Sequence, residues 1–218
     1  MYAPWTLFCL TILLSLPAPA ADPVANKAEE KAEALEHAVA VQAKPAPGTT
    51  LTPTEAKAVD PNGEAALDDT LTCLSRTIYW EAKGACAADM QAVANVVLNR
   101  LGHDGFPDTV CGVVKQGSER HACQFSWWCD GRADQIKEDE PFLQAKEIAR
   151  KTLNRQLPDN SHGALYFHDR KAAPAWRKTF VKTAQTSRFV FYKPKNGAAR
   201  WFLAGNPNGL MADKDDRQ

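Results

Sequence analysis

Apolar residues recur at helical spacing from residue 71 onward. Leu71, Leu74 and Ile78 lie one turn apart and predict a helix that ends near Glu81, where Gly84 can terminate it. The same periodicity predicts helices over about 89–101, 107–115 and 141–156. The chain between residues 71 and 156 is therefore expected to be mainly helical.

Two strand-like runs follow these helices. Residues 164–168 and 188–192 predict strands, whereas residues 116–136 are expected to form a loop or a short hairpin. Together the elements predict one compact α+β domain, mainly helical, over residues 70–193. The C-terminal residues 194–218 are rich in Gly, Pro and Asp and are expected to be a loose tail.

Residues 21–69 differ in composition from the rest of the chain. They contain no aromatic residue and no cysteine, and ten acidic against four basic residues give a charge of −6. Such a segment has little apolar surface to offset the entropy of ordering, so we expect a flexible tether. The alternative is a docked helix over about 26–44, because Ala28, Ala32, Leu35 and Val39 form a weak apolar stripe.

The first 20 residues are typical of a secretory signal peptide. A short apolar stretch runs from Trp5 to Leu16, and Ala18-Pro19-Ala20 provides a small-residue cleavage site. No Lys or Arg precedes the stretch, so an uncleaved anchor is the alternative, although the stretch is short for a membrane span. We expect an exported protein of the periplasm or cell envelope.

Five cysteines remain after removal of this signal, which in an exported chain suggests two disulfides and one leftover thiol. The candidates for disulfides are Cys73, Cys111, Cys123 and Cys129. The last two are near enough in sequence to close a small loop, and their spacing does not match a zinc ribbon. The partner of Cys73 stays open between Cys111 and Cys86.

The overall charge and the absence of certain motifs argue against several classes of function. The chain carries 26 basic and 26 acidic residues, a balance that disfavours a general nucleic-acid binder. It has neither a glycine-rich nucleotide motif nor the G-x-S-x-G of α/β-hydrolases. We expect no cofactor, no bound metal, no nucleic-acid partner and no membrane span in the mature chain.

Glu81 is the acid most informative about chemistry. It follows an apolar helix face and Trp80, and a carboxyl group packed against an indole loses hydration, which raises its pKa. Such a group can donate a proton near neutral pH, as the general acid that cleaves a glycosidic bond must. The alternative is a solvated acid at a helix end, which is the commoner role of such a residue.

A loop over residues 123–130 combines aromatic rings with hydrogen-bonding groups. A disulfide would hold it, and it would offer Gln124, Phe125 and Ser126 to a sugar chain. The alternative is a structural loop with its Trp side chains in the core.

A second such group lies at the end of the first predicted strand and in the loop that follows. It consists of Tyr166, His168 and Trp176, which we also expect to contact substrate. The alternative is packing, with a solvated histidine.

Six ordered blocks between residues 71 and 193 carry a family pattern. The first leads from Leu71-Thr72-Cys73-Leu74 to Ile78-Tyr79-Trp80-Glu81-Ala82-Lys83-Gly84. The others are residues 91–100 (QAVANVVLNR), 106–114 (FPDTVCGVV), 123–126 (CQFS) with 129–131 (CDG), 164–168 (ALYFH) and 174–176 (PAW). Together they resemble the SleB-like cell wall hydrolases, the family of the spore cortex-lytic enzymes.

The resemblance implies a lysozyme-like fold and cleavage of peptidoglycan between N-acetylmuramic acid and N-acetylglucosamine, with Glu81 as the catalytic acid. Cleavage in this family is often non-hydrolytic and leaves a 1,6-anhydro end, so we expect a lytic transglycosylase that works with one carboxyl group. Trp80 would then contact the substrate beside Glu81. A hydrolase would need a second carboxylate, for which Asp130 is the candidate. The +6 charge outside residues 21–69 suits an anionic polymer such as peptidoglycan.

Two positions depart from the family pattern. Lys83 stands where the family usually has Arg, and Ala85 stands where it usually has a second Glu. Because of the change at Ala85, one alternative to an active enzyme is a catalytically inactive peptidoglycan-binding domain.

A second alternative function is that of an N-acetylmuramoyl amidase with His162, His168 and Asp169 as metal ligands. The spacing of these residues is not a recognised zinc pattern.

Overall fold

The computed structural model describes residues 22–120 and 123–195. The predicted signal peptide and nearly all of the predicted C-terminal tail lie outside these residues. The helices are α1 (Pro23–Ala40), α2 (Pro53–Ala58), α3 (Thr70–Ala82), α4 (Ala87–Arg100), α5 (Val110–Lys115), α6 (Ser126–Cys129) and α7 (Asp139–Leu153), with short 3-10 turns η1 (Ser118–Arg120) and η2 (Ala175–Lys178). The strands are β1 (Tyr166–Asp169), β2 (Phe180–Gln185) and β3 (Phe189–Pro194).

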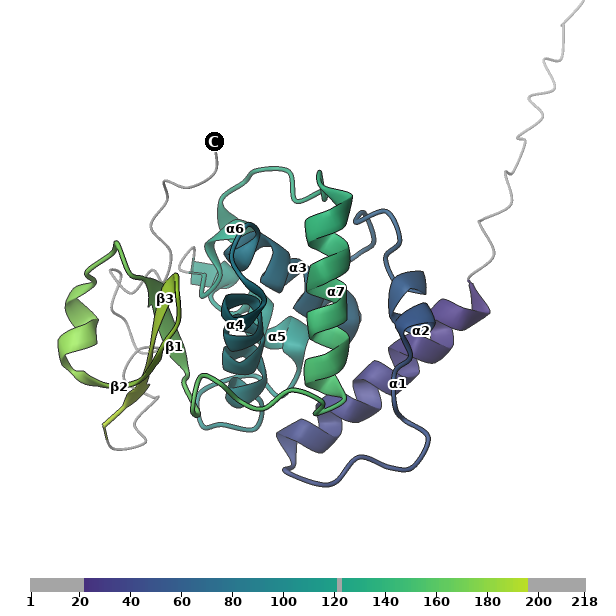
Figure 1. Ribbon diagram of the computed structural model, residues 1–218, viewed down its shortest axis with the longest axis horizontal. Coiled ribbons are helices and arrows are strands. Elements are labelled where there is room, and N and C mark those ends of the chain that lie inside the picture. The colour runs from purple at the N-terminus through teal and green to yellow at the C-terminus, as the bar shows by residue number, and fades with distance from the viewer. Residues whose placement is uncertain (1–21, 121–122, 196–218) are drawn as a thin grey trace, which may run out of the picture.

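The helices gather on one side of the molecule and a small sheet lies at the other end (Figure 1). Its strand order is β1-β3-β2, and both pairs are antiparallel. The two predicted strands pair directly, with Tyr166 opposite Tyr192. The structure thus confirms a mainly helical α+β fold. The lysozyme-like character of that fold stays a prediction.

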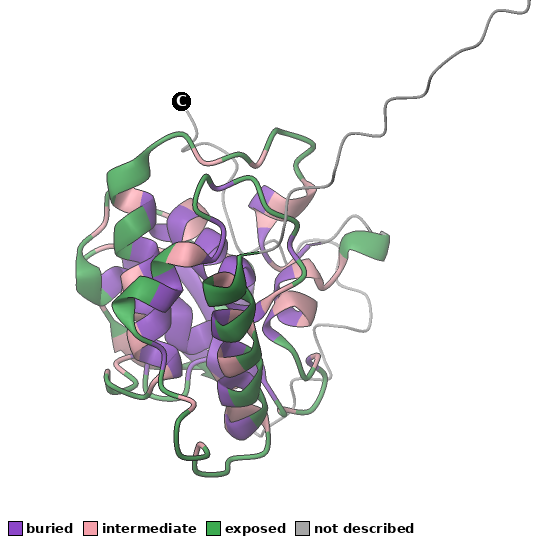
Figure 2. Cartoon of the chain, turned by 90° about the vertical axis from the view of Figure 1, so that its right-hand side faces the viewer, coloured by how far each residue is buried: buried purple, intermediate pink, exposed green. Residues whose placement is uncertain are grey.

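Helix α3 lies at the centre of the core and packs against α1, α4, α5 and α7. Its polar residues are buried along with its apolar ones, so they need internal partners. Arg76, 4% exposed, donates to the Asp60 carboxylate at 2.9 Å and to the Ala65 carbonyl at 2.9 Å. Thr77 donates to the Cys73 carbonyl at 2.8 Å. The buried residues lie between helices whose outer faces are exposed (Figure 2).

The structure differs from the expected tether over residues 21–69. Helix α1 docks on the core beside α2, at the end of the molecule opposite the sheet (Figure 1). Ala28 and Ala32 are fully buried and Leu35 is 2% exposed, so the stripe of the alternative interpretation forms the contact. Small alanine side chains let two helices approach closely, and Lys31 adds a 2.7 Å ion pair with Glu55 of α2. None of the described helices is long and apolar enough to cross a membrane.

A buried carboxyl group fixes α1 to two other helices. Glu36, 5% exposed, accepts hydrogen bonds from the Thr70 hydroxyl at 3.0 Å and from the Val110 backbone N–H at 2.6 Å. Thr70 begins α3 and Val110 begins α5, so Glu36 satisfies an unpaired N–H at a helix start. Burial raises the pKa of Glu36, and these hydrogen bonds oppose that rise only in part.

The described cysteines form two disulfides. Cys73–Cys111 joins α3 to α5, and Cys123–Cys129 closes the loop around α6. The partner of Cys73 is therefore Cys111 and not Cys86, and Cys86 remains an exposed free thiol.

We expect the stability of Glu36→Gln relative to the natural protein to increase as pH rises from the ordinary pKa of a glutamate through the raised pKa of Glu36, and to stay constant above it. The Gln carbonyl oxygen can accept both hydrogen bonds, and it carries no charge that must be desolvated. A carboxyl group whose pKa is raised on folding contributes most below its unfolded pKa, and that contribution is lost as pH rises through the folded pKa. Urea unfolding of both proteins at several pH values measures the difference, and a difference that does not change with pH would contradict it.

We expect Cys73→Ala/Cys111→Ala to lower the free energy of unfolding by about 4 kcal/mol, because the bond closes a long loop in the unfolded chain. The two cysteines are 38 residues apart. Guanidinium unfolding measures the loss. Cys86→Ser is the matched control, because its hydroxyl can keep the hydrogen bond to Asp89, and it should leave the free energy nearly unchanged; an equal loss in the control would mean that the disulfide is not the cause.

Candidate active site

Glu81 lies in the last turn of α3, one residue before the helix ends. Glu81 and Trp80 are both partly exposed, so the end of a buried helix reaches the surface here. The helix stops because Gly84 adopts a left-handed φ of +76°, a conformation that suits glycine after a helix. The sequence placed Glu81 at this helix end, and the structure confirms that placement.

The neighbours of Glu81 in sequence hold this helix end in place. The Tyr79 ring meets the Trp80 ring edge-on, with centroids 5.0 Å apart. The Lys83 ammonium lies 5.1 Å and 5.3 Å from the centroids of these two rings and forms a 3.0 Å ion pair with Glu138. The Tyr79 hydroxyl also donates to Glu138, at 3.1 Å. These contacts limit the motion of the turn that carries Glu81.

A buried arginine lies behind this turn. Arg100 is fully buried and donates from Nε and Nη2 to the Leu165 carbonyl at 3.0 Å and 2.8 Å. Burial lowers the pKa of Arg100 to about 10, while attraction to Tyr166 and Glu81 opposes that shift. Arg100 is therefore charged at neutral pH, and it favours the ionised form of Glu81. Sequence reasoning missed this residue, because an arginine at a helix C-terminus is usually a solvated partner of the helix dipole.

Aromatic rings surround the Arg100 guanidinium. Its Cζ atom lies 5.0 Å from the Phe106 ring centroid, 5.2 Å from that of Phe125 and 5.6 Å from that of Tyr166. These rings replace part of the hydration that the buried cation has lost. The guanidinium thus brings together the loop over 123–130, strand β1 and the end of α3.

The loop over 123–130 has both buried and accessible members. Phe125 is 1% exposed and Trp127 is 1% exposed, whereas Gln124 and Ser126 are partly exposed. The Gln124 Oε1 atom is buried, and no described residue donates a hydrogen bond to it. Phe125 therefore contacts Arg100 inside the protein. Gln124 and Ser126 are the members of this group that solvent partly reaches.

The structure brings Tyr166, His168 and Trp176 together, as their grouping in the sequence suggested. The Trp176 ring centroid lies 6.1 Å from that of Tyr166 and 5.7 Å from that of His168. All three are buried, at 2%, 6% and 2% exposure for Tyr166, Trp176 and His168. Direct contact of these rings with substrate stays a prediction, and their burial favours the packing alternative.

Two of the three residues considered as metal ligands, His168 and Asp169, have other partners. His168 Nδ1 lies 2.7 Å from the Asp169 carbonyl and Nε2 lies 3.2 Å from the Tyr192 hydroxyl. The Asp169 carboxylate pairs with Arg188 at 3.0 Å. Over residues 22–120 and 123–195, no group of three or more His, Cys, Asp or Glu is placed to hold a metal ion.

Asp130, the candidate for a second carboxylate, lies at the C-terminal end of α6 and is exposed. Its Oδ1 atom accepts from the Arg132 backbone N–H at 2.9 Å. A role of Asp130 in the reaction stays a prediction.

Comparison with known proteins identifies the family. The model of the Cell Wall Hydrolase family matches residues 84–192, half of the chain. The chain belongs to the cell wall hydrolase family. This match begins three residues after Glu81. It covers Arg100, the loop over 123–130 and most of the sheet, and the role expected for Glu81 stays a prediction.

Two relatives of this cell wall hydrolase are spore cortex-lytic enzymes. That of Oceanobacillus iheyensis is 30% identical over 120 residues, which are 55% of this chain and 40% of the relative. That of Halalkalibacterium halodurans is 28% identical over 120 residues, which are 53% of this chain and 32% of the relative. The chain thus matches less than half the length of either relative.

Two solved structures are also similar to this cell wall hydrolase. The catalytic domain of the Bacillus cereus SleB protein shares 25% identity at a TM-score of 0.45, over 57% of this chain and 89% of that one. The catalytic domain of the germination-specific lytic transglycosylase SleB from Bacillus anthracis shares 25% identity at a TM-score of 0.46, over 61% and 99%.

We expect Arg100→Met to lower the free energy of unfolding by about 2–4 kcal/mol, because it leaves the Leu165 carbonyl without its donors and removes three ring contacts. Chemical denaturation measures the loss. Arg177→Met is the control, since Arg177 is exposed. Unchanged stability of Arg100→Met would show that the cost of burying the cation equals what its contacts contribute.

Proposed function

We propose that this protein is a peptidoglycan lytic transglycosylase, which cleaves the glycan strand between N-acetylmuramic acid and N-acetylglucosamine. The observation that carries the proposal is the position of Glu81. It is a partly exposed carboxyl group at the end of a buried helix, and the buried cation Arg100 attracts it. Membership of the cell wall hydrolase family supports peptidoglycan as the substrate. The similar protein of Bacillus anthracis is described as a lytic transglycosylase.

The proposed reaction uses Glu81 twice. The protonated carboxyl group first gives its proton to the glycosidic oxygen, and the bond from that oxygen to C1 of the muramic acid breaks. The carbonyl oxygen of the substrate's own acetamido group stabilises the positive C1. The Glu81 carboxylate then takes the proton of the C6 hydroxyl, whose oxygen attacks C1 and forms the 1,6-anhydro ring. No water is consumed, and Glu81 regains its proton.

Arg100 serves the second half of this cycle. A carboxyl group that acts as acid and then as base must be stable enough in both forms. Attraction from Arg100 stabilises the carboxylate that forms when Glu81 has given up its proton. The guanidinium is fixed by the Leu165 carbonyl and by three rings, so it needs no rearrangement during the reaction.

We place the protein outside the cytoplasm, in the periplasm or cell envelope. The Cys73–Cys111 and Cys123–Cys129 bonds favour an oxidising compartment, and peptidoglycan lies there. The predicted signal peptide over residues 1–20 supports the same location.

The test is digestion of purified peptidoglycan with the mature chain, including α1, followed by mass spectrometry of the products. We expect muropeptides one water lighter than hydrolysis products. Glu81→Gln should lower the turnover number by about 10²–10⁴-fold, because Gln can neither donate nor accept the proton. Glu30→Gln on the exposed face of α1 is the control and should keep full activity.

Each other product would change the assignment. Products with hydrated reducing ends would show a hydrolase and direct attention to Asp130. Free peptides would show an amidase. Binding of peptidoglycan without any product would show an inactive wall-binding domain.

A further inference from the structure

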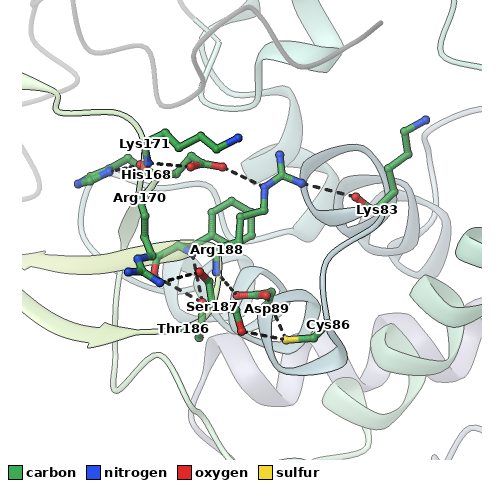
Figure 3. Close-up of polar contacts among 11 residues, drawn as sticks. Lys83, Cys86, Asp89, His168, Arg170, Lys171, Thr186, Ser187 and Arg188 are labelled. Atoms are coloured by element: carbon green, nitrogen blue, oxygen red, sulfur yellow. Dashed lines mark hydrogen bonds and ion pairs between the residues drawn. The ribbon is translucent and has the colours of Figure 1, made fainter.

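A pocket of about 860 Å³ lies beside the turn that carries Glu81. Residues 84–86, which follow α3, line one part of it with Asp89 of α4. Residues 169–171, at and after the end of β1, and residues 187–188, in the turn between β2 and β3, line the rest. Figure 3 shows Arg188 between Lys83 and Asp89, with the Arg170 side chain turned toward Ser187 and the Lys171 side chain at the upper edge of the group. Its volume lies in the range of sites that hold a small ligand, about 300–1,000 Å³.

The two carboxylates of this pocket are engaged by the protein itself. Asp89, 1% exposed, accepts from the Arg188 backbone N–H at 3.0 Å and from the Cys86 thiol at 3.1 Å. Asp169 forms the 3.0 Å ion pair with Arg188 and accepts from the Lys171 backbone N–H at 2.9 Å. A ligand in the pocket therefore meets acids that are already paired.

Two cations of the pocket remain accessible. Arg170 and Lys171 are exposed, and the Arg170 Nη1 atom donates to the Ser187 carbonyl at 2.9 Å. That bond holds the guanidinium in place and leaves its other N–H groups for a ligand, so less entropy is lost on binding. Across the described residues, no carboxylate is paired with the side chain of either cation. The pocket thus presents a guanidinium held by one hydrogen bond and the ammonium group of the next residue in the chain, and each can pair with a carboxylate.

We propose that this pocket binds a carboxylate of the peptide stem that peptidoglycan carries on its muramic acid. The proposal rests on the proposed function and names the part of the substrate recognised beside the scissile bond. Each muramic acid bears its peptide on the lactyl group, and this sugar is the one whose C1 reacts. Gly84 of the pocket is three residues from Glu81, so their Cα atoms are at most about 11 Å apart. This separation is short enough for the peptide of a glycan bound at Glu81 to reach the pocket.

The test compares two forms of the substrate. Glycan strands with intact peptides and strands stripped of peptides by an amidase are digested in parallel, and the ratio of the two kcat/KM values is measured. We expect the natural protein to prefer the peptide-bearing strands. Arg170→Gln/Lys171→Gln should lower the ratio roughly three- to tenfold, as expected for loss of two exposed charge pairs.

The matched control removes the same charge elsewhere. Lys27→Gln/Lys44→Gln neutralises two exposed lysines on and just after α1, at the end of the molecule opposite the sheet, and should leave the ratio unchanged. An equal fall in this control would show general attraction between the protein and the polymer, and would overturn the proposal. An unchanged ratio in Arg170→Gln/Lys171→Gln would also overturn it.

A binding measurement separates this proposal from the proposed function. A soluble muramoyl peptide is titrated into the natural protein and into Arg170→Gln/Lys171→Gln. We expect the dissociation constant of the variant to be roughly three- to tenfold higher than that of the natural protein, the same factor as the fall in the kcat/KM ratio. This holds whether or not glycan is cleaved. Equal affinity of both proteins would refute the pocket, whereas tight binding by the natural protein without cleavage would refute the proposed reaction alone.

Discussion

The burial of the Arg100 guanidinium is the constraint on which the site depends. A buried cation has lost its hydration, so nearby dipoles, rings and charges must stabilise it. Without them, the helix that carries it could not pack in the core. The Leu165 carbonyl, the rings of Phe106, Phe125 and Tyr166, and the attraction to Glu81 meet that need. Because these groups come from separate segments, satisfying one charge aligns helix, loop and strand around Glu81.

The central position of α3 sets the second requirement. A helix buried on all sides needs neighbours on every face, and the segment over residues 84–192 that the family model matches supplies only some of them. Helix α1 supplies another, through Ala28, Ala32 and Leu35, and Glu36 ties it to the start of α3. The N-terminal helices therefore belong to the domain that holds Glu81 in place.

Much of the fold follows from periodicity, and the exceptions have physical causes. The helices after residue 70 and strands β1 and β3 carry enough apolar residues on one face for their pattern to be read. Strand β2 has no buried residue, so its sequence shows no such pattern. The α1 stripe was weak because alanine buries little area. Its docking depends on Glu36 and Lys31, whose partners are distant in sequence.

The position of Glu81 at a helix end was predictable, because it depends on the local sequence. The burial of other residues of the candidate site was not predictable, because it depends on segments that are distant in sequence. Tyr166, His168 and Trp176 form a buried cluster of rings, a fact that their grouping in the sequence does not show. Arg100 is also fully buried, although its position at a helix C-terminus suggests a solvated side chain. In both cases the burial of a residue depends on contacts with segments that are distant in sequence, and no local pattern shows those contacts.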